Sequence, residues 1–158
     1  MNQPHLAQLL AALTAERNAL RSFIELLERE QGMLIANQTD HLFELAEQKS
    51  ANAITLGELA ESRRSLLRRH IPELSIEAIR AWLERHNADG LAAWQEIRAF
   101  AERAQQLNRT NGELIQMKLR HNHQALSVLS KAVNKASLYG PDGQASFSPG
   151  SGRSLGSG

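Results

Sequence analysis

The sequence LAAWQEIRAFAERAQQLNRTNGELIQMKLRHNHQALSVLSKAVNKAS, residues 91–137, contains no proline and a single glycine, Gly112. A proline inside a helix removes a hydrogen bond and clashes with the preceding turn, so a long proline-free stretch permits one unbroken helix. Apolar residues recur here at spacings of three, four and seven, which places them on one side of a helix. We therefore expect one long amphipathic helix that begins near Asp89, its candidate N-cap, and ends before Tyr139-Gly140-Pro141.

Two more long helices are expected before it, joined by residues 37–40. The first runs from about Pro4 to Ala36, and the second, with Thr39 as its N-cap, runs to about Arg69. So short a connection makes two helices antiparallel neighbours. Leucines repeat along one side of each helix: Leu6, Leu13, Leu20, Leu27 and Leu34 at heptad spacing in the first, and Leu42, Leu45, Leu56, Leu59 and Leu66 in the second.

A short helix from Ser75, its N-cap, to about His86 follows Pro72. We expect it to pack against residues 91–101 of the long helix, whose remainder completes a three-helix core with the first two helices. The predicted fold is therefore all-α: an elongated antiparallel bundle of three long helices and one short helix over residues 1–136. Residues 137–158 are rich in glycine and serine, which predicts a flexible C-terminal tail.

The composition excludes several classes of function. The net charge of +1 is too balanced to indicate a nucleic acid partner. The absence of cysteine excludes disulfides, thiolate metal sites and thiol nucleophiles. No segment has the layout of a signal peptide or the long apolar run that membrane insertion requires. These features predict a cytoplasmic protein.

The sequence also lacks the residue patterns of common active sites. No histidine has the Glu-x-x-His or His-x-x-x-His spacing that metal sites in helical bundles use. No serine lies on a strand–turn–helix elbow, and no acid–histidine pair shares a helix side. We therefore predict no enzyme activity, no catalytic residue, no metal site and no cofactor.

Polar residues interrupt the apolar sides of the helices. We expect the asparagines of the long helix to face polar residues of the second helix. A buried asparagine can fix the register of packed helices at some cost in stability, and we favour this interpretation. The alternative is a bundle loosened so that it repacks around a partner. The residues are Asn108, Asn111 and Asn122 on the long helix and Lys49, Asn52 and Arg63 on the second.

Positive charge is concentrated in one cluster near the end of the second helix. Cations in the last turns of a helix complement its dipole and its unpaired carbonyl groups, and we favour this interpretation. The alternative is a patch that binds phosphate, RNA or an acidic partner, although no aromatic residues interleave to stack on bases. The cluster consists of Arg63, Arg64, Arg68, Arg69 and His70.

The end of the long helix carries an apolar stripe formed by Leu119, Leu126, Leu129 and Val133. The stripe either packs in the core or receives the amphipathic helix of a partner, and the sequence does not separate the two. Tyr139, the only tyrosine, either caps the end of the bundle or anchors a second partner, because tyrosine buries much area at little entropic cost.

Two stretches resemble the FlgN-type flagellar export chaperones. The first is Asn-x-x-Asn-Gly-x-Leu-Ile at residues 108–115, and the second is Tyr-Gly-Pro-Asp-Gly at residues 139–143. The resemblance extends over most of the chain, from the leucine heptads of the first helix to the long last helix with its tail.

The resemblance implies a cytoplasmic chaperone of type III flagellar export. Such a protein binds the C-terminal helical segments of hook-associated proteins, which form the hook–filament junction, prevents their premature association and delivers them to the export gate. It implies that Tyr139 docks on the gate. The alternative is a structural coiled-coil module that self-associates through its heptads. The client-binding residues that the resemblance implies are Leu119, Asn122, Leu126, Leu129 and Val133.

Overall fold

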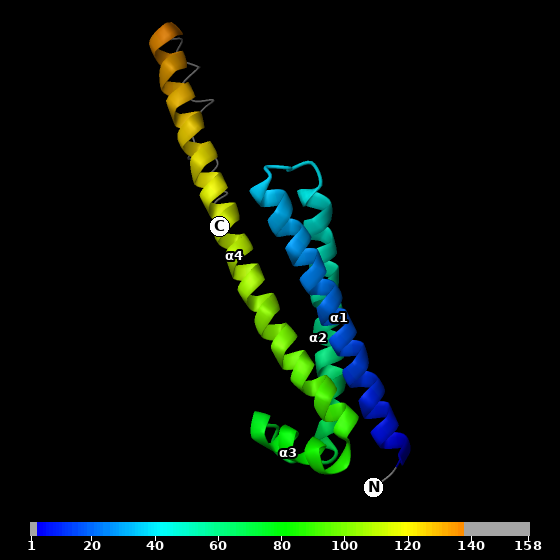
Figure 1. The fold of residues 1–158 in the computed structure, drawn as a ribbon. Helices are drawn as coiled ribbons and strands as arrows, with labels where there is room; N and C mark the ends of the chain where they lie inside the picture. Colours follow the sequence, from blue (N-terminus) through cyan, green and yellow to red (C-terminus); the bar gives the residue numbers. More distant parts are fainter. Residues whose placement is uncertain (1–2, 138–158) are drawn as a thin grey trace. The chain divides into compact units, whose positions relative to one another are not determined.

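The computed structural model describes residues 3–137, which form four α-helices and no strand (Figure 1). The expected all-α class is therefore confirmed, and the helix boundaries fall within a residue or two of those expected. The helices are α1 (Gln3–Ile35), α2 (Leu42–Arg68), α3 (Ile76–His86) and α4 (Ala88–Ser137).

The chain divides into two compact units, Met1–Leu114 and Ile115–Gly158. The first unit holds α1, α2, α3 and the first part of α4, and the described part of the second unit is the remainder of α4. The predicted domain limits, 1–136 and 137–158, stay a prediction, because residues 138–158 lie outside the described part of the chain.

In the first unit α1 and α2 lie side by side and antiparallel, as the short connection predicts (Figure 1). Asn37 in that connection has a φ of 58°, a left-handed conformation that asparagine tolerates better than most residues. The heptad leucines of α1 face inward: Leu13, Leu20, Leu27 and Leu34 are buried and Leu6 is half-buried.

The main hydrophobic cluster lies where α2 ends and α4 begins, and α3 contributes to it. Trp82 and Leu83 of α3 pack there with Trp94 and Ile97 of α4, which confirms that the short helix packs on the start of the long one. The remaining buried members are Leu9, Leu13, Leu20, Leu66, Leu67, Ile71, Ile79 and Ala93.

A second, smaller cluster continues the core along α1 and α4. It joins Leu27 of α1 to Ala104 and Leu107 of α4, with Phe23 and Ile24 packed against it. The expected core of α1, α2 and α4 is therefore confirmed in the main cluster, where all three helices contribute residues, whereas the smaller cluster contains residues of α1 and α4 alone.

Two of the predicted helix caps were wrong and one was right. Ser75 caps α3 as expected, and its Oγ accepts a hydrogen bond from the Ala78 amide at 3.0 Å. Thr39 does not cap α2, because the helix begins later and its N-cap position is His41, which makes no side-chain capping bond.

The junction between α3 and α4 is a single residue, Asn87. Its amide makes the last helical bond of α3, to the Leu83 carbonyl at 2.8 Å, and its extended backbone ends that helix. Its Oδ1 accepts from the Gly90 amide at 2.8 Å, which caps α4. A Cβ on Gly90 would lie 3.1 Å from Asn87 Cγ, so glycine leaves room for this cap. The expected cap Asp89 lies instead in the first turn of α4.

Asn87→Ala is expected to lower the free energy of unfolding by about 1 kcal/mol, because the Gly90 amide loses its acceptor. Urea denaturation followed by circular dichroism measures the change. Asp89→Ala is the control and should cost less, since Asp89 contributes only its charge near the helix N-terminus. A larger loss for Asp89→Ala would mean that Asn87 is not the cap.

Candidate partner-binding site

The apolar stripe predicted near the end of α4 is exposed. Leu119, Leu126 and Leu129 keep 62%, 63% and 60% of their surface accessible, and none of them belongs to a hydrophobic cluster of the first unit. Their spacings of seven and three residues place them on one side of the helix. We call this surface the apolar face.

Two further predicted residues belong to this part of α4. Asn122 is exposed, and its position between Leu119 and Leu126 places it on the same side of the helix. Val133 follows Leu129 by one turn and lies within α4, but its side chain lies outside the described residues. The apolar face therefore has an amide near its centre.

The other side of the same helix segment is not purely polar. Met117 and Val128 are also exposed, at 56% and 67%, and each lies two residues from a leucine of the apolar face, which turns it to the opposite side. They provide a matched comparison for any binding attributed to the apolar face.

The segment is also one-sided in charge. Residues 115–137 contain four cations, namely Lys118, Arg120, Lys131 and Lys135, and no aspartate or glutamate. A helix that exposes leucines among cations, with no acidic residue, is complementary to a partner that carries both apolar and acidic side chains.

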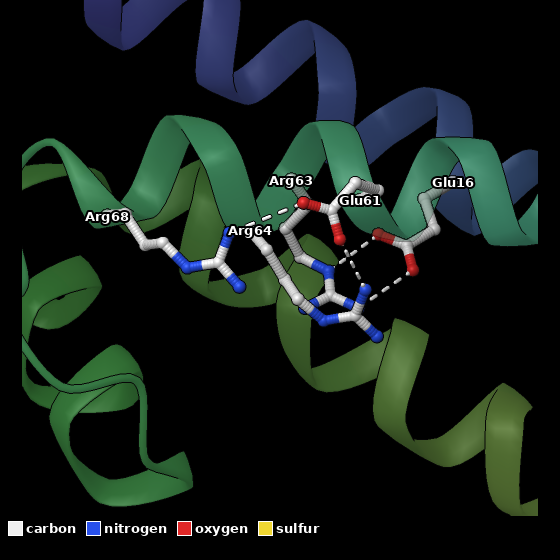
Figure 2. Close-up of polar contacts among 5 residues, drawn as sticks. All are labelled: Glu16, Glu61, Arg63, Arg64 and Arg68. Atoms are coloured by element: carbon white, nitrogen blue, oxygen red, sulfur yellow. Dashed lines mark hydrogen bonds and ion pairs between the residues drawn. The ribbon is translucent and has the colours of Figure 1, made fainter.

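In the first unit the polar residues of the bundle are paired across helices. Glu16 of α1 is 4% exposed, and its two carboxylate oxygens accept from Arg63 Nε at 2.8 Å and Nη2 at 3.2 Å (Figure 2). The Arg63 guanidinium also lies 5.0 Å from the centre of the Trp94 ring on α4. Arg63 of α2 therefore contacts both α1 and α4, and it does not serve to neutralise the end of its own helix.

A second buried carboxylate, Glu30 of α1, organises a similar group. It accepts hydrogen bonds from Lys49 of α2 at 3.2 Å and from Asn111 of α4 at 2.9 Å. Asn111 is fully buried and also donates to the Leu27 carbonyl at 2.9 Å, whereas its Oδ1 has no hydrogen-bond partner among the residues that the structure describes. The geometry agrees with a role in register for Asn111.

The other expected asparagines are not part of this layer, so that part of the prediction was wrong. Asn108 and Asn122 are both exposed. The buried positions of α4 in this region are Ala104, Leu107 and Asn111, and Asn108 is one residue past Leu107, which turns it away from the core.

Sequence reasoning missed Glu16 and Glu30, although a signal was present. The two glutamates lie two heptads apart on α1, and Lys49 and Arg63 lie two heptads apart on α2. In an antiparallel pair of helices that equality allows both ion pairs to form in a single register.

The predicted cluster of positive charge divides into separate contacts. Arg64 and Arg68 share one exposed carboxylate, that of Glu61, at 3.2 Å and 3.3 Å (Figure 2). Hydrogen bonds from Arg68 and then Arg64 lower the pKa of Glu61, so this carboxyl group stays ionised. The favoured interpretation was that these cations complement the dipole at the end of α2. Arg63 does not fit it, because its side chain points into the bundle and pairs with Glu16.

His70 has a different environment from the arginines. Its ring stacks on Trp82 of α3 with centroids 4.8 Å apart, and His5 and His86 lie nearby. Burial lowers the pKa of His70, and the positive charges of His5, Arg69 and His86 lower it further. The imidazole is therefore neutral at neutral pH and acts as an aromatic packing group.

Within residues 3–137 no group of three or more histidine, aspartate or glutamate side chains is arranged to hold a metal ion. None of the helices within these residues is both long enough and apolar enough to cross a membrane.

The sequence profile of the family described as FlgN protein matches residues 1–146. This chain belongs to the FlgN family. The resemblance to this family is therefore confirmed, and residues 108–115 and 139–143 lie inside the matched region. Tyr139 itself lies outside the residues that the structure describes.

Flagella synthesis proteins of the FlgN family are similar to this chain along nearly their whole length. The flagella synthesis protein FlgN of Salmonella typhimurium is 31% identical over 152 residues, covering 95% of this chain and 96% of the relative. The protein of the same name from Yersinia enterocolitica is 32% identical over 156 residues, covering 98% and 95%. No solved structure is significantly similar to the chain.

Arg63→Met is expected to lower the free energy of unfolding by about 3 kcal/mol, because Glu16 stays buried without its cation. The double variant Glu16→Leu, Arg63→Met should recover most of that loss, since no buried charge remains. Urea denaturation of the four members of this cycle measures the coupling.

The matched control for this cycle is Arg80→Met, which breaks the exposed pair between Arg80 and Glu84. It should change the free energy of unfolding by less than about 1 kcal/mol. If the double variant loses as much as the sum of its single variants, Glu16 and Arg63 do not stabilise the bundle as a pair.

Proposed function

We propose that this protein is a cytoplasmic chaperone of flagellar type III export that carries no enzymatic activity. It binds the C-terminal helical segments of hook-associated proteins, prevents their premature association and delivers them to the export gate. The observation that carries the proposal is the exposed apolar face in a chain of the FlgN family.

The apolar face supports binding of a helical client. Leucines at spacings of three and seven form a ridge that an amphipathic helix contacts through its own apolar side. Burying the three leucines contributes about 5–9 kcal/mol, which is comparable to the roughly 4–15 kcal/mol that association costs. Such an interface supports a complex that can release its client at the export apparatus.

The charge of the segment supports a client with acidic residues beside its apolar stripe. Residues 115–137 carry cations and no acid, so an acidic client helix would meet no like charge there. Asn122 would lie within the interface, where its amide can satisfy a polar group of the client.

Delivery is assigned to Tyr139, which follows α4 in sequence and precedes Gly140 and Pro141. A tyrosine beside residues that end a helix is suited to enter a pocket of a second partner. This division would let the chaperone hold its client and engage the gate at the same time.

The double variant Leu126→Asp, Leu129→Asp is expected to weaken client binding by at least about a hundredfold, because it places two charges in an apolar contact. Isothermal titration with the C-terminal helical segment of a hook-associated protein measures the affinity. Helicity should persist, since both leucines are exposed in the free protein.

The matched control is Met117→Asp, Val128→Asp, which adds the same charges at exposed apolar positions on the opposite side of the helix. It should bind the client nearly as the parent does. Equal losses in both variants, or unfolding of the leucine variant, would contradict the proposal. A dimer that persists at every concentration and dissociates only in the leucine variant would favour the self-associating module instead.

Tyr139→Ala is expected to leave client affinity unchanged and to reduce export strongly, because the tyrosine contacts the gate and not the client. Export is measured as the amount of hook-associated protein secreted by cells that carry the variant. Tyr139→Phe keeps the ring and should retain most export. Parallel loss of client affinity and export in Tyr139→Ala would show that the two sites are not separate.

A further inference from the structure

The first unit contains a surface pocket that the proposed chaperone function does not use. It has a volume of about 520 Å³ and lies between the last turns of α2, the connection to α3, the start of α3 and Trp94 of α4. A volume of this size accommodates two or three side chains of a bound peptide.

The walls of the pocket have two chemical characters. Trp94 and Ile79, both nearly buried, and Ile76, which is 47% exposed, form an apolar part. Arg64 and Arg68 form a cationic part, and their side chains are 43% and 55% exposed.

The arginines of the pocket differ in how their charge is already used. Arg63 also lines the pocket, but the buried carboxylate of Glu16 neutralises it. The carboxylate of Glu61 accepts one hydrogen bond from Arg64 and one from Arg68 (Figure 2). Each guanidinium carries five N–H donors, so this carboxylate leaves most of them available. Among the described residues that line the pocket, Glu73 is the only acid, against three arginines.

We propose that this pocket binds a short segment of a partner protein that carries an acidic residue next to apolar residues. The acidic side chain accepts hydrogen bonds from N–H groups of Arg64 and Arg68 that Glu61 leaves available. An apolar side chain packs on the exposed part of Ile76, beside the accessible edges of Ile79 and Trp94. The site lies in the first unit and does not depend on the apolar face of the second unit.

A peptide fits this pocket better than RNA does. RNA recognition uses aromatic rings with open faces on which bases stack, whereas Trp94 is only 7% exposed and lies under the Arg63 guanidinium. The side chains of Ile76 and Ile79 carry no hydrogen-bonding group for a base edge. They are suited to contact leucine, isoleucine or valine side chains.

The two tryptophans of the chain provide the readout. Trp94 lines the pocket, whereas Trp82 packs against His70 and His86 away from it. The full-length protein, labelled with ¹⁵N, is titrated with a blocked seven-residue peptide that alternates glutamate and leucine. The Trp94 indole N–H signal should shift and the Trp82 signal should not, with Trp82→Phe and Trp94→Phe used to assign them.

Three variants define the site. Arg64→Gln, Arg68→Gln should weaken the peptide by at least about tenfold, because both guanidinium groups are lost. Ile76→Ser should weaken it too, at an exposed position that the fold does not need. Glu61→Gln should strengthen binding several-fold, since the competing carboxylate is removed.

Two control variants test whether the peptide binds specifically in this pocket. Arg80→Gln, Arg103→Gln removes two similarly exposed, paired arginines elsewhere and should leave binding unchanged. Leu126→Asp, Leu129→Asp should also bind the peptide normally, so failure of the chaperone proposal would leave this result intact.

The proposal is overturned if Trp94 does not respond, or if a peptide with glutamine in place of glutamate binds equally well. It is also overturned if Arg64→Gln, Arg68→Gln binds normally. A single-stranded oligouridine that competes with the peptide, binds more tightly and depends on the same arginines would identify a nucleic acid site instead.

Discussion

Glu16 and Glu30 are buried on α1, and a buried carboxylate is costly unless a cation lies within hydrogen-bonding distance. Arg63 and Lys49 of α2 supply those cations. Glu16 and Glu30 are two heptads apart on α1, and Lys49 and Arg63 are two heptads apart on α2. Both ion pairs can therefore form in the same antiparallel register. A leucine heptad alone tolerates a slide of seven residues, whereas such a slide would separate both ion pairs and leave four charges without partners.

Two of these residues, Glu30 and Arg63, also fix the position of α4 against α1 and α2. Asn111 donates to Glu30, and Arg63 covers the Trp94 ring, so α4 is fixed to both ion pairs of the α1–α2 layer. Asn111 is fully buried, and a buried asparagine that donates to another helix specifies the alignment of packed helices at some cost in stability. Arg63 also lines the surface pocket between α2, α3 and Trp94, so one side chain contributes both to the stability of the bundle and to the wall of that pocket.

The two units use their apolar residues differently. In the first unit leucine and tryptophan side chains are buried in continuous clusters. In residues 115–137, the described part of the second unit, Leu119, Leu126 and Leu129 stay exposed among cations, and this segment contains no acidic residue. Exposed apolar surface of this kind marks interaction sites. Together with membership in the FlgN family, this exposure supports the proposal that the end of α4 binds a partner.

Spacing along the chain was enough to predict the all-α fold, the four helices, the inward leucines of α1 and the cap at Ser75, because helix periodicity and capping are local properties. It did not predict that Asn87 rather than Asp89 caps α4, since both residues can cap and the position where α3 ends selects between them. The buried ion pairs of Glu16 with Arg63 and of Glu30 with Lys49 were not predicted either, although the spacing of these residues is visible in the sequence. Which polar residues are buried depends on which helix sides meet, and that is set by packing between residues far apart in sequence.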